Sequence, residues 1–228
     1  MTVIHRLVVA SCLAAALSPS LGAIGQPRGA VLGRLPAAPD PAARYVIYLH
    51  GRIIEEQGRR PTDARWGVYE YDAILGTLAR DGATVVSEQR PSGTGIDAFA
   101  AHVADQVRDL LDAGVPPDHV SVVGFSKGGG IAIRTSVLVA NPRVNFVFLA
   151  ACGDGDFSGF DGRVWGRILS VYESSDDIGR SCRELFERST GTGERSEIAI
   201  AVGEEHGTFY RPHAEWVGPV LRWIAASR

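Results

Sequence analysis

The chain has 228 residues, of which 45% are hydrophobic and 21% are charged, and its formal net charge is −3. This composition is typical of a folded globular protein and excludes a disordered chain. The weak negative charge gives no overall attraction to nucleic acid or to an anionic membrane surface, so neither is expected as a partner.

The first residues have the pattern of a secretory signal peptide. Met1–Arg6 is short and basic, Leu7–Leu17 is apolar, and small residues follow as far as Ala23. The apolar run is much shorter than the ~20 residues of a membrane-spanning helix, and no second long apolar segment follows. We therefore expect a signal peptide over 1–23, a single mature domain over 24–228, no membrane span, and export to the periplasm or the extracellular space.

Behind the signal region, apolar runs alternate with amphipathic segments. In chain order the predicted elements are an edge strand near Ala30–Leu35, a strand at Tyr45–Leu49, a polar turn-rich stretch at Arg52–Trp66, a helix at Val68–Arg80, a strand at Thr84–Ser87, a helix at Ile96–Ala113, a strand at Val120–Val123, a helix at Lys127–Val139, strands at Val144–Ala150 and Arg167–Tyr172, a helix at Ile178–Arg188, a strand at Ile198–Val202 and a helix at Ala214–Ala226. The strands are short and apolar, as in a buried parallel sheet, and the helices repeat their apolar residues at helical spacing. This alternation predicts a three-layer α/β/α sandwich with a mostly parallel sheet.

The pentapeptide Gly124-Phe125-Ser126-Lys127-Gly128 lies between a predicted strand and a predicted helix. It matches the G-x-S-x-G pattern, in which a sharp strand-to-helix turn presents a nucleophilic serine and its neighbours must be very small. The following helix places its positive end at the hydroxyl. The alternative is a glycine-rich turn in which Ser126 only caps the helix.

With these features the chain resembles the α/β-hydrolase superfamily from Tyr45 onward. In that superfamily the nucleophile, the acid and the histidine follow one another along the chain, and the histidine lies in the loop after the last core strand. His206 occupies this place, and the resemblance implies that it is the base that activates Ser126.

The acid of the triad is expected in the segment from Leu169 to Ile178, which resembles the superfamily's strand-and-acid segment. Asp176 fits that position best, and Asp177 is one residue away. Further alternatives are Glu173, and Asp154 or Asp156 after the preceding strand.

The dipeptide His50-Gly51 resembles the superfamily's oxyanion motif. Two backbone N–H groups are expected to hold the developing oxyanion. One would come from Lys127 and the other from Arg52 or Gly51.

Basic side chains are expected around the mouth of the site. Lys127 is the only lysine of the chain, which indicates that the position beside the nucleophile requires a compact ammonium group. Four loop arginines are expected to border the mouth and could favour an acidic substrate, namely Arg52, Arg59, Arg60 and Arg90. Arg90 and His50 are our candidate substrate-binding residues, and solvated loop charge is the alternative for each arginine.

Removal of the signal peptide would leave two cysteines, Cys152 and Cys182. An even pair in an oxidising compartment favours a disulfide. The resemblance supports this, because it places the two residues just after neighbouring strands at the edge of the sheet that carries the active site.

The sequence thus predicts a serine hydrolase that cleaves a carboxylic ester or related acyl bond of a small molecule through an acyl-enzyme. The segment Ala151–Gly166 is too short for a large cap domain. No cofactor is expected and no metal site, because Asp154–Gly159 only loosely resembles a calcium loop and lacks its closing glutamate. The alternatives are a catalytically inactive binding protein with the same fold and, less favoured, an anion-binding turn.

Overall fold

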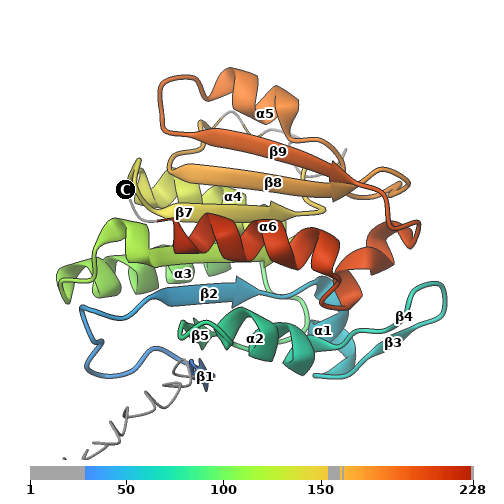
Figure 1. Cartoon of the computed structure of the whole chain (residues 1–228), viewed down its shortest axis with the longest axis horizontal. Coiled ribbons are helices and arrows are strands. Elements are labelled where there is room, and N and C mark those ends of the chain that lie inside the picture. Colours follow the sequence, from blue (N-terminus) through green and yellow to red (C-terminus); the bar gives the residue numbers. More distant parts are fainter. Residues whose placement is uncertain (1–28, 154–159, 161, 227–228) are drawn as a thin grey trace, which may run out of the picture.

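The computed structural model describes residues 29–153, 160 and 162–226. In this part of the chain, seven strands form one sheet in the order β1-β5-β2-β6-β7-β8-β9 (Figure 1). The strands are β1 (Val31–Leu32), β2 (Tyr45–Leu49), β5 (Thr84–Val86), β6 (Val120–Phe125), β7 (Asn145–Leu149), β8 (Arg167–Glu173) and β9 (Arg195–Ile200). Every pairing in this sheet is parallel.

Helices cover both faces of the sheet. They are α1 (Arg52–Gln57), α2 (Tyr71–Ala79), α3 (Ile96–Asp112), α4 (Lys127–Val139), α5 (Arg183–Arg188) and α6 (Ala214–Ala225), with short 3-10 helices η1 (Pro117–His119) and η2 (Glu205–Tyr210). Figure 1 shows α2 and α6 in front of the sheet and α3 and α4 behind it. The predicted three-layer sandwich is therefore confirmed.

The central strands are buried on both faces because successive side chains point into opposite layers. In β2, Val46 and Tyr48 join the apolar cluster under α2 and α6. Tyr45, Ile47 and Leu49 join the cluster under α3 and α4. This explains why the strands are continuous apolar runs in the sequence.

The chain reverses its direction of travel across the sheet at β2. From β2 it moves outward to β5, and then returns to the other side of β2 as β6. In open α/β sheets, ligand sites form beyond the carboxyl ends of the strands at such a reversal. The segments that meet here are the β2–α1 connection, with Gly51, and the β6–α4 turn, with Ser126.

The polar stretch Arg52–Trp66 is more structured than predicted. It contains α1 and the first strand of a small antiparallel hairpin, β3 (Thr62–Asp63) paired with β4 (Gly67–Val68). Val68 was predicted to begin a helix but belongs to β4. Helix α5 begins at Arg183 and not at the predicted Ile178, because the chain before it packs closely on the β7 end, where a Cβ on Gly179 would lie 2.4 Å from the Ala150 carbonyl oxygen.

The predicted signal peptide and the calcium-like loop at Asp154–Gly159 lie outside the described residues, as do the alternative acids Asp154 and Asp156. Among the residues that the structure does describe, no helix is both long enough and apolar enough to cross a membrane.

Candidate active site

Ser126 lies on a strained turn between β6 and α4. Its φ is 53° and its ψ is −119°, a conformation that costs a residue other than glycine of order 1–3 kcal/mol. The turn is possible because its neighbours lack side chains. A Cβ on Gly124 would lie 2.2 Å from the Gly128 carbonyl oxygen, and a Cβ on Gly128 would lie 2.0 Å from the Leu49 carbonyl oxygen. The strain holds the hydroxyl at the carboxyl edge of the sheet.

The structure brings His206 to this hydroxyl from 80 residues further along the chain. His206 lies in η2, after β9, and its Nε2 is 2.9 Å from Ser126 Oγ. The ring is buried between Phe125 and Trp66, with centroid distances of 4.8 Å and 5.3 Å. An imidazole clamped between two aromatic rings keeps its orientation toward the serine.

Asp176 completes a hydrogen-bonded chain with these two residues. Its Oδ2 lies 2.8 Å from His206 Nδ1, and its side chain is fully buried. Its other oxygen accepts a hydrogen bond of 2.8 Å from the Ile178 amide. Asp177, the alternative acid, is exposed and pairs with Arg65 at 3.3 Å. Of the two neighbouring aspartates, only Asp176 faces the histidine.

Glu173, another alternative acid, lies at the end of β8 and has a different set of partners. Its buried carboxylate accepts hydrogen bonds from the hydroxyl and the amide of Ser175, and from the Gly203 amide at 3.3 Å. Burial alone would raise the pKa of Glu173, but these hydrogen bonds outweigh it and hold the pKa below its ordinary value. Glu173 thereby ties the loop of Asp176 to the loop that precedes His206.

The two candidate oxyanion donors, Arg52 and Lys127, lie at helix N-termini. Arg52 and Lys127 are the first residues of α1 and α4, so their N–H groups have no partner within their own helices. Gly51 is the N-cap and lies outside the helix, so the first helical N–H of α1 is that of Arg52. Between the two residues considered for the second donor, this favours Arg52.

Ser126 and His206 open onto a cleft of about 700 Å³. Its apolar and aromatic wall consists of Ile53, Trp66, Ile96, Phe125, Ala150, Ile178 and Tyr210. Its charged residues are Arg52, Glu56, Asp63, Lys127 and Asp177. Acidic and basic groups are thus mixed along the part of the wall that the structure describes.

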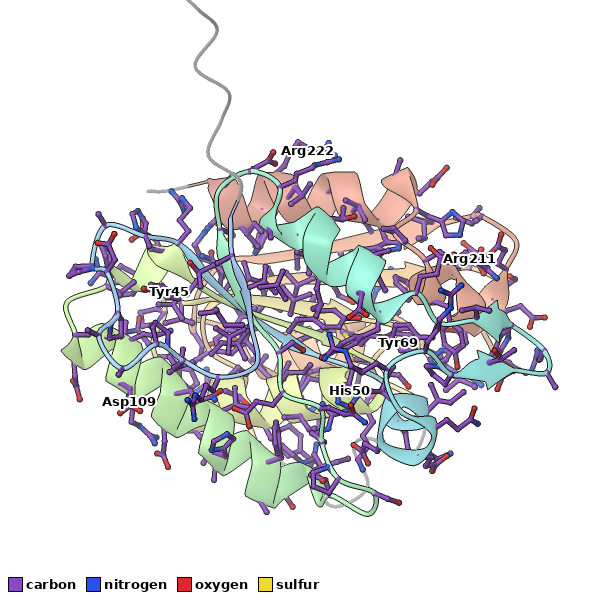
Figure 2. All side chains as sticks on the ribbon, turned by 90° about the horizontal axis from the view of Figure 1, so that it is seen from below. Tyr45, His50, Tyr69, Asp109, Arg211 and Arg222 are labelled. Atoms are coloured by element: carbon purple, nitrogen blue, oxygen red, sulfur yellow. A yellow bond between two sulfur atoms is a disulfide. The ribbon has the colours of Figure 1, made fainter. Side chains whose placement is uncertain are left out.

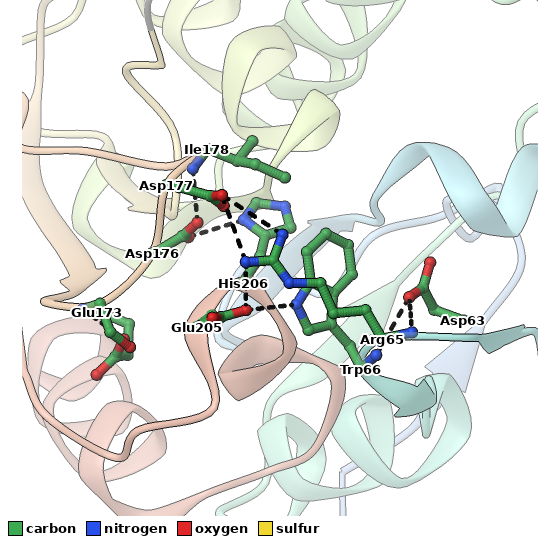
Figure 3. A network of polar contacts seen from close by, with 10 residues as sticks. Asp63, Arg65, Trp66, Glu173, Asp176, Asp177, Ile178, Glu205 and His206 are labelled. Atoms are coloured by element: carbon green, nitrogen blue, oxygen red, sulfur yellow. Dashed lines mark hydrogen bonds and ion pairs between the residues drawn. The ribbon is translucent and has the colours of Figure 1, made fainter.

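The β3–β4 hairpin contributes residues that the sequence analysis did not single out. Arg65 lies 2.6 Å from Glu205 and also pairs with Asp177, so it joins the residues next to His206 and Asp176 (Figure 3). The hydrogen bond from Arg65 lowers the pKa of Glu205. Trp66 donates from its indole N–H to Glu205 at 3.3 Å while its ring packs on His206. No local sequence pattern marks these residues, because they reach the site only through the fold.

His50 and Arg90 do not line the cleft, so their assignment as substrate-binding residues is wrong. Both are buried, and Figure 2 shows His50 and Tyr69 well inside the molecule. The Arg90 amide donates to His50 Nε2 at 3.0 Å, which leaves the proton of the neutral ring on Nδ1, 2.8 Å from the Gly51 carbonyl. Burial, and then the charge of Arg90, lower the pKa of His50 to about 4. At neutral pH His50 is therefore an uncharged structural residue.

The arginine-rich mouth was also predicted incorrectly. Of the four loop arginines, only Arg52 lines the cleft, and it pairs with Glu56 at 3.5 Å. Arg59 pairs with Asp72, and it lines a separate cavity together with Arg60. The arginines give no basis for a preference for acidic substrates.

The predicted pairing of Cys152 with Cys182 is present in the structure. The bond joins residues 30 positions apart, with 5.3 Å between their Cα atoms. Cys152 follows β7 and Cys182 follows the loop of Asp176. The Arg180 amide adds a hydrogen bond of 3.0 Å to the Ala151 carbonyl. The loop that carries the acid is thus fastened to its neighbour at two points.

Comparison with known proteins gives structural relatives and no sequence relatives. No family model matches the chain, and no curated protein matches it either.

Solved structures do match. The esterase Pf2001 from Pyrococcus furiosus has a TM-score of 0.57 and 15% identity over 82% of this chain and 84% of its own. SOBER1 from Arabidopsis thaliana has a TM-score of 0.53 and 14% identity over 81% and 98%.

The ATU1826 protein from Agrobacterium tumefaciens, which is of unknown function and proposed to be an α/β hydrolase, has a TM-score of 0.57 and 16% identity over 84% and 88%. These three structures match most of the described fold at 14–16% sequence identity, so the likeness concerns the fold. The chain has the α/β-hydrolase fold.

Proposed function

We propose that this protein is a serine hydrolase that cleaves a carboxylic ester, or a related acyl bond, through a covalent acyl-enzyme. One observation carries the proposal: Ser126, His206 and Asp176 form a hydrogen-bonded chain at 2.9 Å and 2.8 Å, with the serine facing an open cleft. This is the geometry that nucleophilic catalysis by serine requires.

In the first step the Ser126 oxygen attacks the carbonyl carbon while His206 Nε2 takes the hydroxyl proton. Asp176 holds the imidazole by Nδ1 and stabilises its charged form. The N–H groups of Lys127 and Arg52 stabilise the oxyanion of the tetrahedral intermediate. When the intermediate collapses, the alcohol leaves with the proton from His206.

In the second step water attacks the acyl-enzyme, with His206 again as the base. The acid is released and Ser126 recovers its proton. The cleft wall around the serine is mixed in charge and rich in apolar and aromatic side chains. It suits an uncharged ester of moderate size, because the basic residues of the cleft, Arg52 and Lys127, are each already paired with a glutamate. The likeness to the esterase from Pyrococcus furiosus supports the same reaction class.

The test is labelling with a fluorophosphonate probe together with turnover of p-nitrophenyl acetate. We expect the wild type to be labelled at Ser126 and to hydrolyse the ester. Ser126→Ala should not be labelled, and its kcat should fall by at least about 10³-fold. Ser92→Ala is the matched control, because Ser92 is exposed and lies away from the cleft. Wild-type protein that neither reacts nor turns over the ester would leave a catalytically inactive binding protein as the better interpretation.

We also propose that the protein is exported. The disulfide between Cys152 and Cys182 supports this, because such bonds persist in oxidising compartments. Mass spectrometry of protein recovered from outside the cytoplasm should find an N-terminus between residues 21 and 24, and recovery of the intact N-terminus there would contradict the proposal.

A further inference from the structure

A buried cluster of charged side chains lies behind the wall of the cleft. Glu55 of α1 accepts from Arg90 Nε at 2.7 Å with one carboxylate oxygen, and from Lys127 Nζ at 2.5 Å with the other. The side chains of Glu55 and Arg90 are 1% and 0% exposed, and that of Lys127 is 16% exposed. Arg90 is further anchored through its guanidinium to the carbonyl of His50. Each oxygen of one carboxylate thus holds a cation from a distant part of the chain.

Stability alone is a poor explanation for this cluster. Removing charges from water carries a desolvation cost that a buried ion pair often fails to repay. The cost is higher here because Arg90 Nη1 is buried without a hydrogen-bond partner among the described residues. Apolar side chains of the same volume would fill the space at less cost. A buried cluster that adds little to the stability of the fold is expected to have a role in the adjoining site.

The cluster connects the two segments that carry the proposed oxyanion donors. Glu55 stands three residues after Arg52 in the same helix, and Lys127 directly follows Ser126. Helix α1 has only six residues, and its N-cap, Gly51, provides no side-chain hydrogen bond. So short a helix is not stable by itself. The bond between Glu55 and Lys127 is therefore a direct connection between two elements that would otherwise meet only through packing.

The use of lysine at this place fits the same reasoning. Lys127 is the only lysine in the chain, which uses arginine for its other basic side chains. A guanidinium is planar and larger than an ammonium group. Here the carboxylate already engages one guanidinium, that of Arg90, and the second cation must also fit beside the glycine-lined turn. A compact ammonium group meets that requirement.

We propose that Glu55 is a positioning residue for the oxyanion hole. Its carboxylate, held by Arg90, fixes α1 against the start of α4 through Lys127. The N–H groups of Arg52 and Lys127 are thereby kept at the separation that a tetrahedral oxyanion needs. This inference rests on the proposed function and adds to it, because Glu55 contacts neither the substrate nor the reacting atoms. Its effect must appear in the rate of the chemical step.

The expected loss of kcat follows from the contribution that one oxyanion donor makes to the rate. Removal of one oxyanion donor lowers kcat by about 10²–10³-fold. Displacing a donor without removing it should lower kcat by a smaller factor, roughly 10- to 100-fold. The Glu55 side chain does not itself line the cleft, so KM should stay within about threefold of the wild-type value.

The experiment compares Glu55→Gln, Lys127→Met and Lys127→Arg, with Glu215→Gln as the matched control on the exposed surface of α6. Hydrolysis of p-nitrophenyl acetate gives kcat and KM, and titration with a fluorophosphonate probe counts active sites, so that misfolded protein does not enter kcat. We expect Glu55→Gln and Lys127→Met to lose 10- to 100-fold in kcat at nearly constant KM. Lys127→Arg should recover part of this loss, and the Glu55→Gln, Lys127→Met double variant should lose no more than the worse single variant. If Glu55→Gln does not fold, Lys127→Met makes the same test at a partly exposed side chain.

The outcomes separate this inference from the proposed function. Unchanged kcat per active site in Glu55→Gln and Lys127→Met would overturn the inference alone. A rise in KM with constant kcat in Lys127→Met would also overturn it, since Lys127 would then act on substrate binding. Wild-type protein without labelling or turnover would overturn the proposed function and, with it, the positioning role.

Discussion

Replacing both Cys152 and Cys182 with alanine is expected to lower the melting temperature substantially while leaving the chemistry almost intact. The bond closes a loop of 30 residues, and the loop-entropy relation gives about 3.6 kcal/mol of stabilisation for that length at 25 °C. For a protein of this size each kcal/mol shifts Tm by about 2–4 °C, so the expected loss is roughly 7–14 °C. Alanine is preferred to serine because both cysteines are buried in the apolar cluster under α3 and α4.

Thermal unfolding followed by circular dichroism measures this change. Wild-type protein that has been unfolded and refolded in dithiothreitol should melt near the double-alanine variant, and dithiothreitol should not change the variant itself. At 25 °C the kcat of the variant on p-nitrophenyl acetate should remain within about threefold of wild type. The reason is that the Arg180 amide still bonds the Ala151 carbonyl and keeps the acid loop in place. A loss of Tm below 2 °C in both the variant and the reduced wild type would show that the cross-link does not restrain the unfolded chain as calculated.

Two further predictions concern acidic residues at the end of β8 and in the loop that follows it. Asp176→Asn should lower kcat by roughly 10³–10⁴-fold, because an amide favours the wrong tautomer of His206, whereas Asp177→Asn should change kcat by less than about fivefold; equal losses in the two variants would mean that the acid is wrongly assigned. Glu173, whose pKa is lowered in the folded protein, contributes stability that is present above its unfolded pKa and lost as the pH falls through its folded pKa. Glu173→Gln should therefore lower Tm at pH 7 and bring the two proteins together toward pH 3, and parallel Tm curves from pH 3 to pH 7 would contradict this.

The sequence predicted the sheet well because its central strands are buried on both faces. A strand such as Tyr45–Leu49 is apolar at every position, and that pattern has few other interpretations. The turn at Ser126 could be predicted equally well, because it requires neighbours without side chains and the sequence has glycines at 124 and 128. The roles of His206 and Asp176 were expected from the resemblance to the α/β-hydrolase superfamily, in which loops after later strands carry the acid and the histidine.

What the sequence did not reveal depends on contacts between distant residues. The α1 helix went unrecognised because it is six residues long and mostly polar, and one of its buried residues is Glu55. Glu55 is buried only because Arg90 and Lys127, 35 and 72 positions away, supply its charge partners. For the same reason Arg90 was expected at the mouth of the site, with solvated loop charge as the alternative. The hairpin residues Arg65 and Trp66 likewise acquire their place against His206 only in the folded chain.

The parallel pairing of β2 with β6 has a consequence for how the site could tolerate change. The last pair in the register of these two strands is Leu49 with Gly124. The turns that lead to Arg52 and Lys127 begin directly after this pair. The spacing of the strand ends from which α1 and α4 begin is therefore set by backbone hydrogen bonds, and the bond between Glu55 and Lys127 acts on the helices beyond them. Connections at the amino ends of the strands, such as the one between α3 and β6, can be lengthened or exchanged without disturbing that spacing. Grafting new loops there would alter the outer surface of the protein while its chemistry stayed the same.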